Sequence, residues 1–522
     1  MSRTFRNPIL TGYYPDPSIC RVGEDFYLVV STFEYFPGLP LLHSRDLVHW
    51  QQIGHVLDRP SQLPLDGIRP SGGLYAPTIR HHAGVFYVIN TLVDGATRSG
   101  NFIVTATDPT GSWSEPYWLE GAAGFDPSLF FDDDGKAWYT GTRLKAGSDF
   151  AQGQTEIWLQ ELDLANMCLT GEQVVIWDGA VKNAVWSEAP HLYKIDGRYY
   201  LITAEGGTAH HHAVIVARSA AITGPYEGNR GNPIMTHRQL GLDYPIVGTG
   251  HGDLVQTQNG EWWMVLLAMR PYGGYFYNLG RETFLAPVRW EEGWPIVSPG
   301  TGRVEFTYPA PDLPEHDWPT VPTRDDFDQA TLAPGWFFLR TPREDFWSLS
   351  DRSGWLRLRC RPQHLAERVN PSFVGRRQQH IHFSAQALLE FTPQTQDECA
   401  GLVLRQNEDF HFRFVVTLAD QPVVRVIKRA AGVEEVLAER PIGAGRCYLK
   451  IEAHEQAYTF YAATEPDQWQ VVAGQVDGRI LSTPVAGGFV GAVIALYASG
   501  NGQISTNVAD FDWFEYVGLD PV

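Results

Sequence analysis

The 522-residue sequence predicts an all-β protein in which a five-bladed β-propeller precedes a β-sandwich of the concanavalin-like jelly-roll type. The first observation behind this prediction is a repeat in the first 270 residues, where an aromatic residue opens an apolar, strand-like run five times. These aromatics are Tyr27, Tyr87, Trp138, Tyr200 and Trp263, at spacings of 60, 51, 62 and 63 residues. Self-similarity at this period in a strand-rich chain indicates propeller blades.

A second observation is the short related segment that precedes each of these strands. The segments PDPSI, YAPTI, FDPSL, EAPHL and HGDLV place Asp16, Tyr75, Asp126, Glu188 and His251 at nearly one repeat position. Asp16 lies eleven residues before its aromatic and the others lie twelve before theirs, an offset that we expect to matter little at a proline-punctuated strand entrance. The alternative is that the acids only start turns, as Asp before Pro often does. Because the first strand of each blade lines the central channel, we expect three carboxylates and a histidine in one pocket.

The second half of the chain differs in pattern. Five prolines and no periodicity between Tyr308 and Pro322 predict a stiff connection between two domains. We therefore expect a propeller at residues 1–308, a linker at 309–324 and a sandwich at 325–522. Beyond the linker, alternating runs such as Trp355–Arg359 and Ala387–Phe391 are typical of two packed antiparallel sheets.

Composition excludes several classes of function. The formal net charge is −20 without a basic block, so nucleic acid and anionic membranes are not expected partners. The N-terminal residues contain no apolar stretch of signal-peptide length, and no run of 18 apolar residues occurs, which predicts a soluble, cytoplasmic protein. Five cysteines without a CxxC pair argue against a disulfide framework and a zinc site. The 13% of aromatic residues suit stacking on sugar rings, although aromatic-rich β cores are the alternative.

An ordered set of motifs gives a family resemblance. They are PDPS with Asp16, STFEYFPG with Phe33, HSRDLVHW, GGLYAP with Tyr75, GFDPSLF with Phe125 and Asp126, SEAPH with Glu188, TAEGGT, and LGRET with Arg281. On these residues the chain resembles glycoside hydrolase family 43, in particular β-xylosidases with a C-terminal β-sandwich. The resemblance implies a general base, a second Asp that orients and tunes, and a Glu general acid, acting with inversion. Matched by motif, these roles fall on Asp16, Asp126 and Glu188.

The resemblance also implies residues that bind the substrate. They are expected to be Phe33, Tyr75, Phe125, Arg281 and Phe489. Tyr75 stands where relatives commonly have Trp. Phe489 in AGGFVGA is the nearest match to an aromatic with which the sandwich closes the pocket, and an ordinary core position is its alternative. Arg281 is expected to grip sugar hydroxyls or tune the carboxylates, with a surface ion pair as the alternative.

One residue of the repeat, His251, bears on metal binding. No cofactor is expected to be required, but family members often have a histidine beside a channel-bound calcium or water. His251 is therefore the candidate ligand for Ca²⁺ in the propeller channel, and a hydrogen-bonded core histidine is its alternative.

The chemistry of the acids is consistent with these roles. Inversion needs one protonated carboxyl group at the leaving oxygen and one ionised carboxylate that activates water. Glu188 lies beside Trp186, and apolar surroundings near other carboxylates keep an acid protonated. Asp16 and Asp126 each begin a DPS turn, whose amides and hydroxyl are expected to stabilise an anion. A further acid, Glu205 in TAEGGT, is expected to anchor blade contacts or to line a rim instead.

We therefore predict an exo-acting inverting glycosidase that releases terminal β-D-xylose from short xylooligosaccharides, with α-L-arabinofuranosidase as a side activity. A dedicated α-L-arabinofuranosidase is the alternative within the family. A non-catalytic carbohydrate-binding propeller is the alternative of another class, and clustered, mutually repelling carboxylates argue against it. The resemblance also suggests a homo-oligomer.

Overall fold

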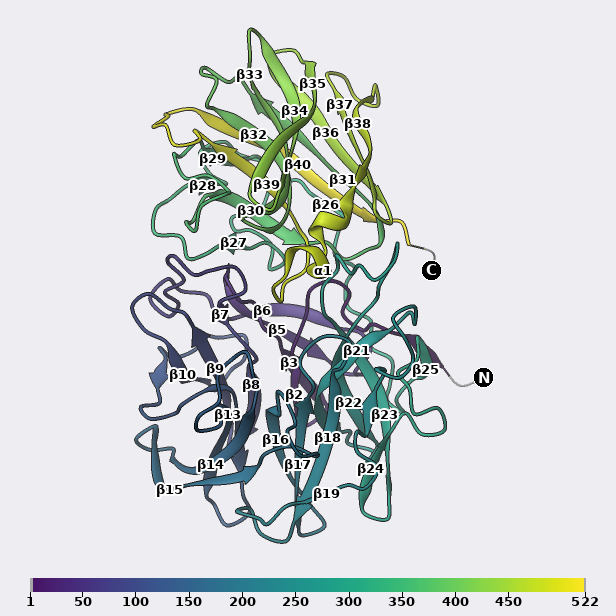
Figure 1. Ribbon diagram of the computed structural model, residues 1–522. Helices are drawn as coiled ribbons and strands as arrows, with labels where there is room; N and C mark the ends of the chain where they lie inside the picture. The colour runs from purple at the N-terminus through teal and green to yellow at the C-terminus, as the bar shows by residue number, and fades with distance from the viewer. Residues whose placement is uncertain (1–2, 521–522) are drawn as a thin grey trace.

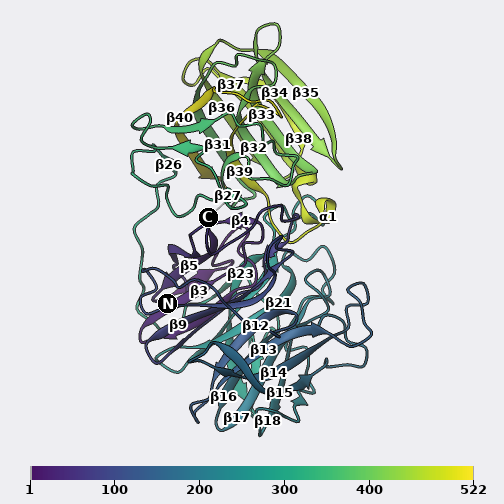
Figure 2. The same cartoon turned by 90° about the vertical axis from the view of Figure 1, so that its left-hand side faces the viewer.

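The computed structural model describes residues 3–520, so the outer ends of the two predicted domains, at residues 1 and 522, lie outside the described residues. Strands make up nearly all of the regular structure, arranged as two stacked bodies (Figure 1). Helical residues in the described part are confined to a 3₁₀ turn at Gly478–Leu481 and to α1 (Thr483–Ala486), next to the junction of the bodies (Figure 2). Neither has the length or apolar character needed to cross a membrane.

The N-terminal body is a β-propeller built from separate antiparallel sheets. The first contains β2 (Ser18–Val22), β3 (Asp25–Val29), β5 (Gly38–Ser44) and β6 (Gln51–Leu57). The second contains β7 (Gly73–Leu74), β8 (Thr78–His82), β9 (Val85–Val93), β10 (Gly100–Ala106) and β11 (Tyr117–Trp118). The third contains β12 (Phe125–Phe131), β13 (Ala137–Leu144), β14 (Thr155–Asp163) and β15 (Cys168–Trp177). The fourth contains β16 (Glu188–Ile195), β17 (Arg198–Glu205), β18 (Ala213–Ser219), β19 (Glu227–Gly228) and β20 (Met235–Thr236). The fifth contains β21 (Val247–Gln256), β22 (Trp262–Met269), β23 (Glu282–Glu291) and β24 (Trp294–Val297).

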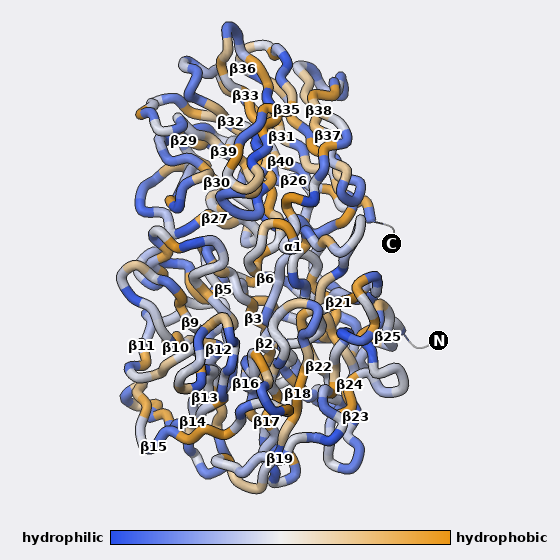
Figure 3. The backbone as a smooth tube through the Cα atoms, in the orientation of Figure 1, coloured by the Kyte–Doolittle hydropathy of each residue, from blue (hydrophilic) through white to orange (hydrophobic). Residues whose placement is uncertain are grey.

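Hydrophobic clusters join these sheets into a ring. Separate clusters lie between the second and third sheets, the third and fourth, and the fourth and fifth. Another cluster joins the fifth sheet to the first, and a larger one joins the first to the second and continues into the C-terminal body. Middle strands are therefore buried on both faces, which explains the continuous apolar run of β22, whereas the outer strand β15 is largely exposed. In Figure 3 hydrophobic stretches follow the strands and hydrophilic stretches the loops.

The N-terminal segment closes this ring. β1 (Thr4–Arg6) pairs with β25 (Thr307–Pro309), which follows the fifth sheet. The Asn7 side chain donates to the carbonyl of Leu285 at 2.9 Å and accepts from the amide of the same residue at 2.9 Å. The start of the chain is thereby bonded to its fifth sheet, directly before it enters the first.

The C-terminal body is a β-sandwich. One sheet contains β26 (Arg324–Asp325), β28 (Trp347–Ser348), β29 (Leu356–Arg359), β31 (His382–Phe391), β36 (Gly445–His454), β37 (Ala457–Ala463), β38 (Gln470–Asp477) and β40 (Val508–Gly518). The other contains β30 (Ser372–Arg377), β32 (Cys399–Asn407), β33 (Phe410–Leu418), β34 (Pro422–Ala430), β35 (Val433–Pro441) and β39 (Val493–Ser499). Residues alternate between buried and half-buried along β36, as expected for a sheet with one solvated face. β39 is buried throughout because its second face packs toward the propeller.

The two bodies are joined by more than the linker. β4 (Tyr35–Phe36) of the propeller pairs with β27 (Phe338–Leu339) of the C-terminal half. A second shared cluster contains Phe33 and Tyr35 together with sandwich residues such as Phe373 and Tyr497. The linker also lies on the propeller, where Trp318 Nε1 donates to the carbonyl of His49 at 3.2 Å. The limits at residues 308, 309, 324 and 325 stay predictions.

Candidate active site

The inner strands of the five sheets share one register. In each sheet, one residue of the inner strand pairs with the residue that lies two positions after the repeat aromatic on the neighbouring strand. These inner-strand residues are Ser18, Thr78, Ser128, His191 and Asp253. The residues two positions earlier in the chain are Asp16, Ala76, Asp126, Ala189 and His251. Asp16, Asp126 and His251 are therefore equivalent, whereas Glu188 and Tyr75 lie one residue before that position. The one-residue offset of Asp16 in the count from the aromatics arises because the third and fifth hairpins each hold one residue more between the paired positions than the first.

Left-handed backbone turns the catalytic candidates into the channel. Asp16, Asp126 and His251 have φ values of 56°, 50° and 50°, and Ala189, next to Glu188, has 53°. Strand pairing is interrupted at Asp126, at Ala189 and at His251, as in a β-bulge. For a residue other than glycine this conformation costs about 1–2 kcal/mol. Strain at the same level of several strands indicates a functional constraint.

A cavity of about 220 Å³ opens at this level of the channel. All nine residues that the sequence predicted for the site line it: Asp16, Phe33, Tyr75, Phe125, Asp126, Glu188, His251, Arg281 and Phe489. Phe489 is the contribution of the sandwich, and the others come from the propeller. The structure thus brings every predicted side chain into one enclosure.

Asp16 is the best stabilised anion of the cavity. Arg281 Nη1 lies 2.6 Å from its Oδ1, and Ser31 Oγ donates to its Oδ2 at 2.6 Å. Burial alone would raise the pKa of Asp16, but Arg281, His251 and Ser31 together hold that pKa below its ordinary value. The DPS turn was expected to stabilise this anion through its amides and hydroxyl, but Ser18 Oγ and the Ile19 amide donate to Asp253 instead. Asp16 is therefore ionised and fixed in position.

Asp126 and Glu188 are in the opposite electrostatic situation. Burial and the charge of Asp16 raise the pKa of Asp126, against the smaller effect of Arg281. Burial, then the charges of Asp126 and Asp16, raise the pKa of Glu188 well above its ordinary value. Because both pKa values are raised, at least one proton is retained between the two groups near neutral pH. A cavity with one fixed anion and one retained proton has the components of acid–base catalysis.

Aromatic rings form another part of the cavity wall. Phe33 stacks on Phe489 at a centroid distance of 5.8 Å, and Tyr75 meets Phe489 edge-on at 6.0 Å. The Arg281 guanidinium lies 5.5 Å from both phenylalanine rings. Apolar faces beside charged hydrogen-bonding groups suit a sugar, which has both kinds of surface.

The layer below the cavity is filled by a second buried ion pair. Arg80 Nη1 lies 2.9 Å from Asp253 Oδ2, and Arg80 Nη2 lies 3.0 Å from His191 Nδ1. Tyr193 also donates to Asp253. These residues close the channel beneath Asp16 and His251, so the cavity is a blind pocket.

The donor set near His251 does not fit a calcium ion held by protein ligands. Ca²⁺ takes six to eight oxygen ligands. The oxygens of Asp16 already accept from Arg281 and Ser31, and those of Asp253 from Arg80 and Ser18. Burial lowers the pKa of His251, whose Nδ1 lies 3.6 Å from Asp16 Oδ1. In residues 3–520, three side chains with donor atoms within 4.8 Å of one another occur on the surface, at His49, Glu315 and Asp317.

Several residues of the cavity were not proposed from the sequence as site residues. They are Ala76, Phe150, Trp186, Gly207 and Thr208. Thr208 accepts from Arg281 Nη1 at 3.1 Å and lies in the TAEGGT motif, which could have indicated it. Phe150 is 58% exposed and packs edge-on against Trp186, but its loop carries no sequence signal. Glu205 lies outside the cavity lining and accepts from the amide of Ala180 at 2.9 Å, as expected for an anchoring residue.

Comparison with known proteins gives the family. The sequence profile of Glycosyl hydrolases family 43 matches residues 5–295. The chain belongs to glycoside hydrolase family 43. The profile of the β-xylosidase C-terminal concanavalin A-like domain matches residues 324–517, which agrees with the sandwich of this family 43 member.

Relatives of the family 43 chain match it over almost its whole length. It is 48% identical to a xylosidase/arabinosidase of Butyrivibrio fibrisolvens, over 97% of this chain and 98% of the relative. It is 44% identical to a non-reducing end α-L-arabinofuranosidase of Bacteroides ovatus, over 99% and 96%. The crystal structure of a xylan β-1,4-xylosidase from Bacillus halodurans superposes with a TM-score of 0.92 at 37% identity, covering 98% and 99%.

Replacing Arg281 should move the acid limb of the pH profile. The Arg281 charge lowers the pKa of Asp16, so Arg281→Met should raise that pKa, and the limb of kcat/KM at low pH should move up by about 1–3 units. Activity at the optimum should also fall, because the variant loses a substrate contact. Arg270→Met is the control, since Arg270 pairs with Glu282 and not with Asp16. An acid limb that stays in place in Arg281→Met would exclude Asp16 as the group that must be ionised.

Proposed function

We propose that this family 43 glycoside hydrolase removes terminal β-D-xylosyl units from short xylooligosaccharides with inversion, and that it has α-L-arabinofuranosidase side activity. The observation that carries the proposal is a blind, aromatic-walled cavity in which one guanidinium fixes one carboxylate while two others share raised pKa values. Relatives named xylosidase and arabinosidase support the choice of sugars.

The proposed roles follow from these charges. Glu188 donates its proton to the glycosidic oxygen as the bond to the anomeric carbon breaks. Asp16 takes a proton from the water that attacks that carbon from the opposite face. Asp126, coupled to both acids, helps Glu188 retain its proton until the substrate is bound. Glu188 ends ionised and Asp16 protonated, so proton exchange with water restores the site.

Exo action follows from the shape of the pocket. The Arg80–Asp253 layer closes its floor, and Phe489 of the sandwich closes one side. A chain can then enter only by its non-reducing end and loses one sugar per encounter. We also propose that the five sheets around this pocket are the blades of a five-bladed propeller, a count that an experimental structure with a different number of sheets would contradict.

Two aryl glycosides and a product analysis test the function. We expect a higher kcat/KM on nitrophenyl β-D-xylopyranoside than on nitrophenyl α-L-arabinofuranoside, and proton NMR should detect α-xylose first. The opposite preference would favour a dedicated α-L-arabinofuranosidase. No hydrolysis of either compound would favour a carbohydrate-binding propeller, and β-xylose as first product would refute inversion.

Removing the acid should affect poor leaving groups most. In Glu188→Gln, kcat/KM should fall about 100-fold or more on xylobiose but much less on nitrophenyl xyloside, because only the poor leaving group needs a proton. In Asp16→Asn, kcat/KM should fall strongly on both substrates. Glu205→Gln is the matched control, because Glu205 is a buried acid of the same sheet outside the cavity lining. Its kcat/KM on both substrates should stay close to that of the unaltered enzyme. Equal losses of Glu188→Gln on both substrates would remove it from the acid role.

We propose further that catalysis needs no metal, because the carboxylate oxygens near His251 already have protein partners. Exhaustive EDTA treatment should then leave kcat/KM unchanged. Slower turnover after chelation that Ca²⁺ restores would instead support the channel calcium site at His251.

Partners and location stay predictions. Xylooligosaccharides are the expected substrates, with no nucleic acid or membrane partner. We also predict a homo-oligomer, which light scattering after gel filtration would detect. We predict a cytoplasmic location, which cell fractionation would test.

A further inference from the structure

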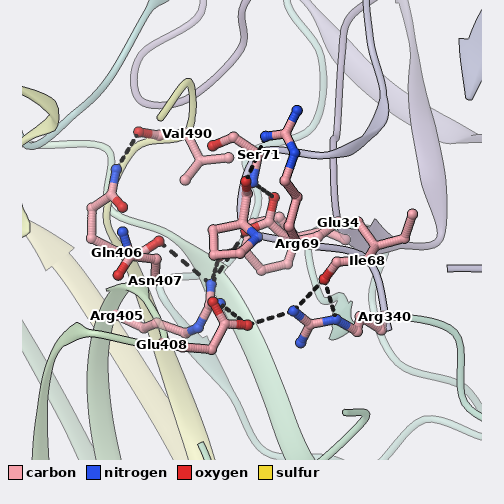
Figure 4. Close-up of polar contacts among 12 residues, drawn as sticks. Glu34, Ile68, Arg69, Ser71, Arg340, Arg405, Gln406, Asn407, Glu408 and Val490 are labelled. Atoms are coloured by element: carbon pink, nitrogen blue, oxygen red, sulfur yellow. Dashed lines mark hydrogen bonds and ion pairs between the residues drawn. The ribbon is translucent and has the colours of Figure 1, made fainter. Parts of the chain in front are cut away.

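The aromatic wall from the sandwich depends on side chains that hold its backbone. The wall loop, residues 486–491, carries Phe489 into the cavity. On the propeller side, Ser71 Oγ accepts from the Phe489 amide at 2.8 Å, and Arg281 donates to the Phe489 carbonyl at 3.3 Å. On the sandwich side, Gln406 Nε2 donates to the Val490 carbonyl at 2.9 Å, and Asn407 Nδ2 to that of Ala486 at 3.1 Å. Figure 4 shows the contact between Gln406 and Val490.

Ser71 is itself held in an unfavourable backbone conformation. It is buried, its φ is 57°, and its amide donates to Glu34 Oε2 at 3.0 Å. The wall loop fits closely against it, because a Cβ at Gly488 would lie 2.5 Å from Ser71 Oγ. The position of Phe489 therefore depends on the position of Ser71, and the position of Ser71 depends on its hydrogen bond to the Glu34 carboxylate.

Behind Ser71 lies a buried charge cluster of Glu34, Arg340, Arg405 and Glu408 (Figure 4). Glu34 Oε1 lies 3.6 Å from Arg405 Nη1, and Arg405 Nη2 lies 3.1 Å from Glu408 Oε1. Arg340 donates to Glu408 at 2.5 Å and to the carbonyl of Ile68 at 2.6 Å. Two positive and two negative groups cancel. Glu34 belongs to the propeller and the other three to the sandwich, so the cluster crosses the junction.

Stability alone does not account for this cluster. A buried ion pair is generally no more stable than apolar residues of the same volume, because desolvation offsets the attraction. Glu34 Oε1, Arg405 Nε and Glu408 Oε2 have, in the described chain, no hydrogen-bond partner, which adds to that cost. The best-attested use of buried charged groups is to fix one relative position of two structural elements. Here the parts are the Ser71 loop and the sandwich strand that carries Arg405 and Gln406.

We propose that Ser71 and the Glu34–Arg405 pair are positioning residues that fix Phe489 over the bound sugar. The pair links Glu34 of the propeller to Arg405 of the sandwich. Gln406, the neighbour of Arg405, holds the loop on one side, and Ser71 holds it on the other. This inference rests on the proposed function, since it concerns the wall of the same pocket.

Enzyme kinetics and hydrogen exchange on the full chain test the inference. Ser71→Ala should raise KM for xylobiose about 2- to 10-fold, the worth of one hydrogen bond, and change kcat less. Amide exchange of a peptide spanning residues 483–491 should become faster, because the Phe489 amide loses its acceptor. Glu34→Met/Arg405→Met, which keeps the cluster neutral at similar volume, should change KM and exchange in the same direction.

Rescue separates positioning from a general loss of stability. Glu34→Gln/Arg405→Met retains a side-chain oxygen that can accept from the Ser71 amide but still lacks the link to Arg405, so its KM should return only part of the way toward that of the unaltered enzyme. Asp510→Asn is the matched control, a buried acid paired with Arg352 and Arg357 in the sandwich, and should lower stability without changing KM or exchange.

Unchanged KM and exchange in both Ser71→Ala and Glu34→Met/Arg405→Met would overturn the inference. An unaltered protein that hydrolyses neither aryl glycoside would overturn the proposed function instead. The exchange comparison would then decide the inference by itself, because it needs no turnover.

Discussion

One guanidinium facing three carboxyl groups is the constraint on which the site depends. Three buried negative charges in one small cavity would repel one another strongly, and Arg281 can compensate only part of that charge. Because Arg281 contacts Asp16, the other two carboxyl groups, Asp126 and Glu188, relieve the repulsion by retaining a proton. The division into one fixed anion and two carboxyl groups with raised pKa values is therefore a consequence of where a single cation lies, and not of the individual carboxyl groups.

The sequence supported most of the fold and the site, for identifiable physical reasons. Strand periodicity and turn residues predicted the sheets, and the proline-rich segment predicted the change of architecture. Convergence of repeat positions at an axis predicted that Asp16, Asp126 and Glu188 meet. Phe33, Phe125 and Arg281 followed from motifs of the family. These features all depend on local pattern or on repetition, which a single sequence contains.

What the sequence could not supply depends on geometry between distant segments. The count from the aromatics placed Asp16 one residue out of line with Asp126 and His251 because hairpin length varies between repeats, whereas strand pairing makes the three equivalent. The anion at Asp16 is stabilised by Ser31 and Arg281, whose contacts cross the sheet and the ring, instead of by its own turn. Ser71 and Arg405 carry no motif, since their importance lies in a junction between domains whose relative position no local pattern determines.

Closure of the ring by β1 and β25 has a consequence for how the enzyme folds. Asp16 and Arg281 are 265 residues apart in sequence, on the first and last parts of the propeller. Individual sheets can form from neighbouring residues, but these two side chains meet only when the two ends of the propeller segment join. Loop closure over such a separation comes late in folding. The Asp16–Arg281 pair therefore forms only when the ring is complete, so the appearance of activity during refolding should report completion of the ring rather than formation of its sheets.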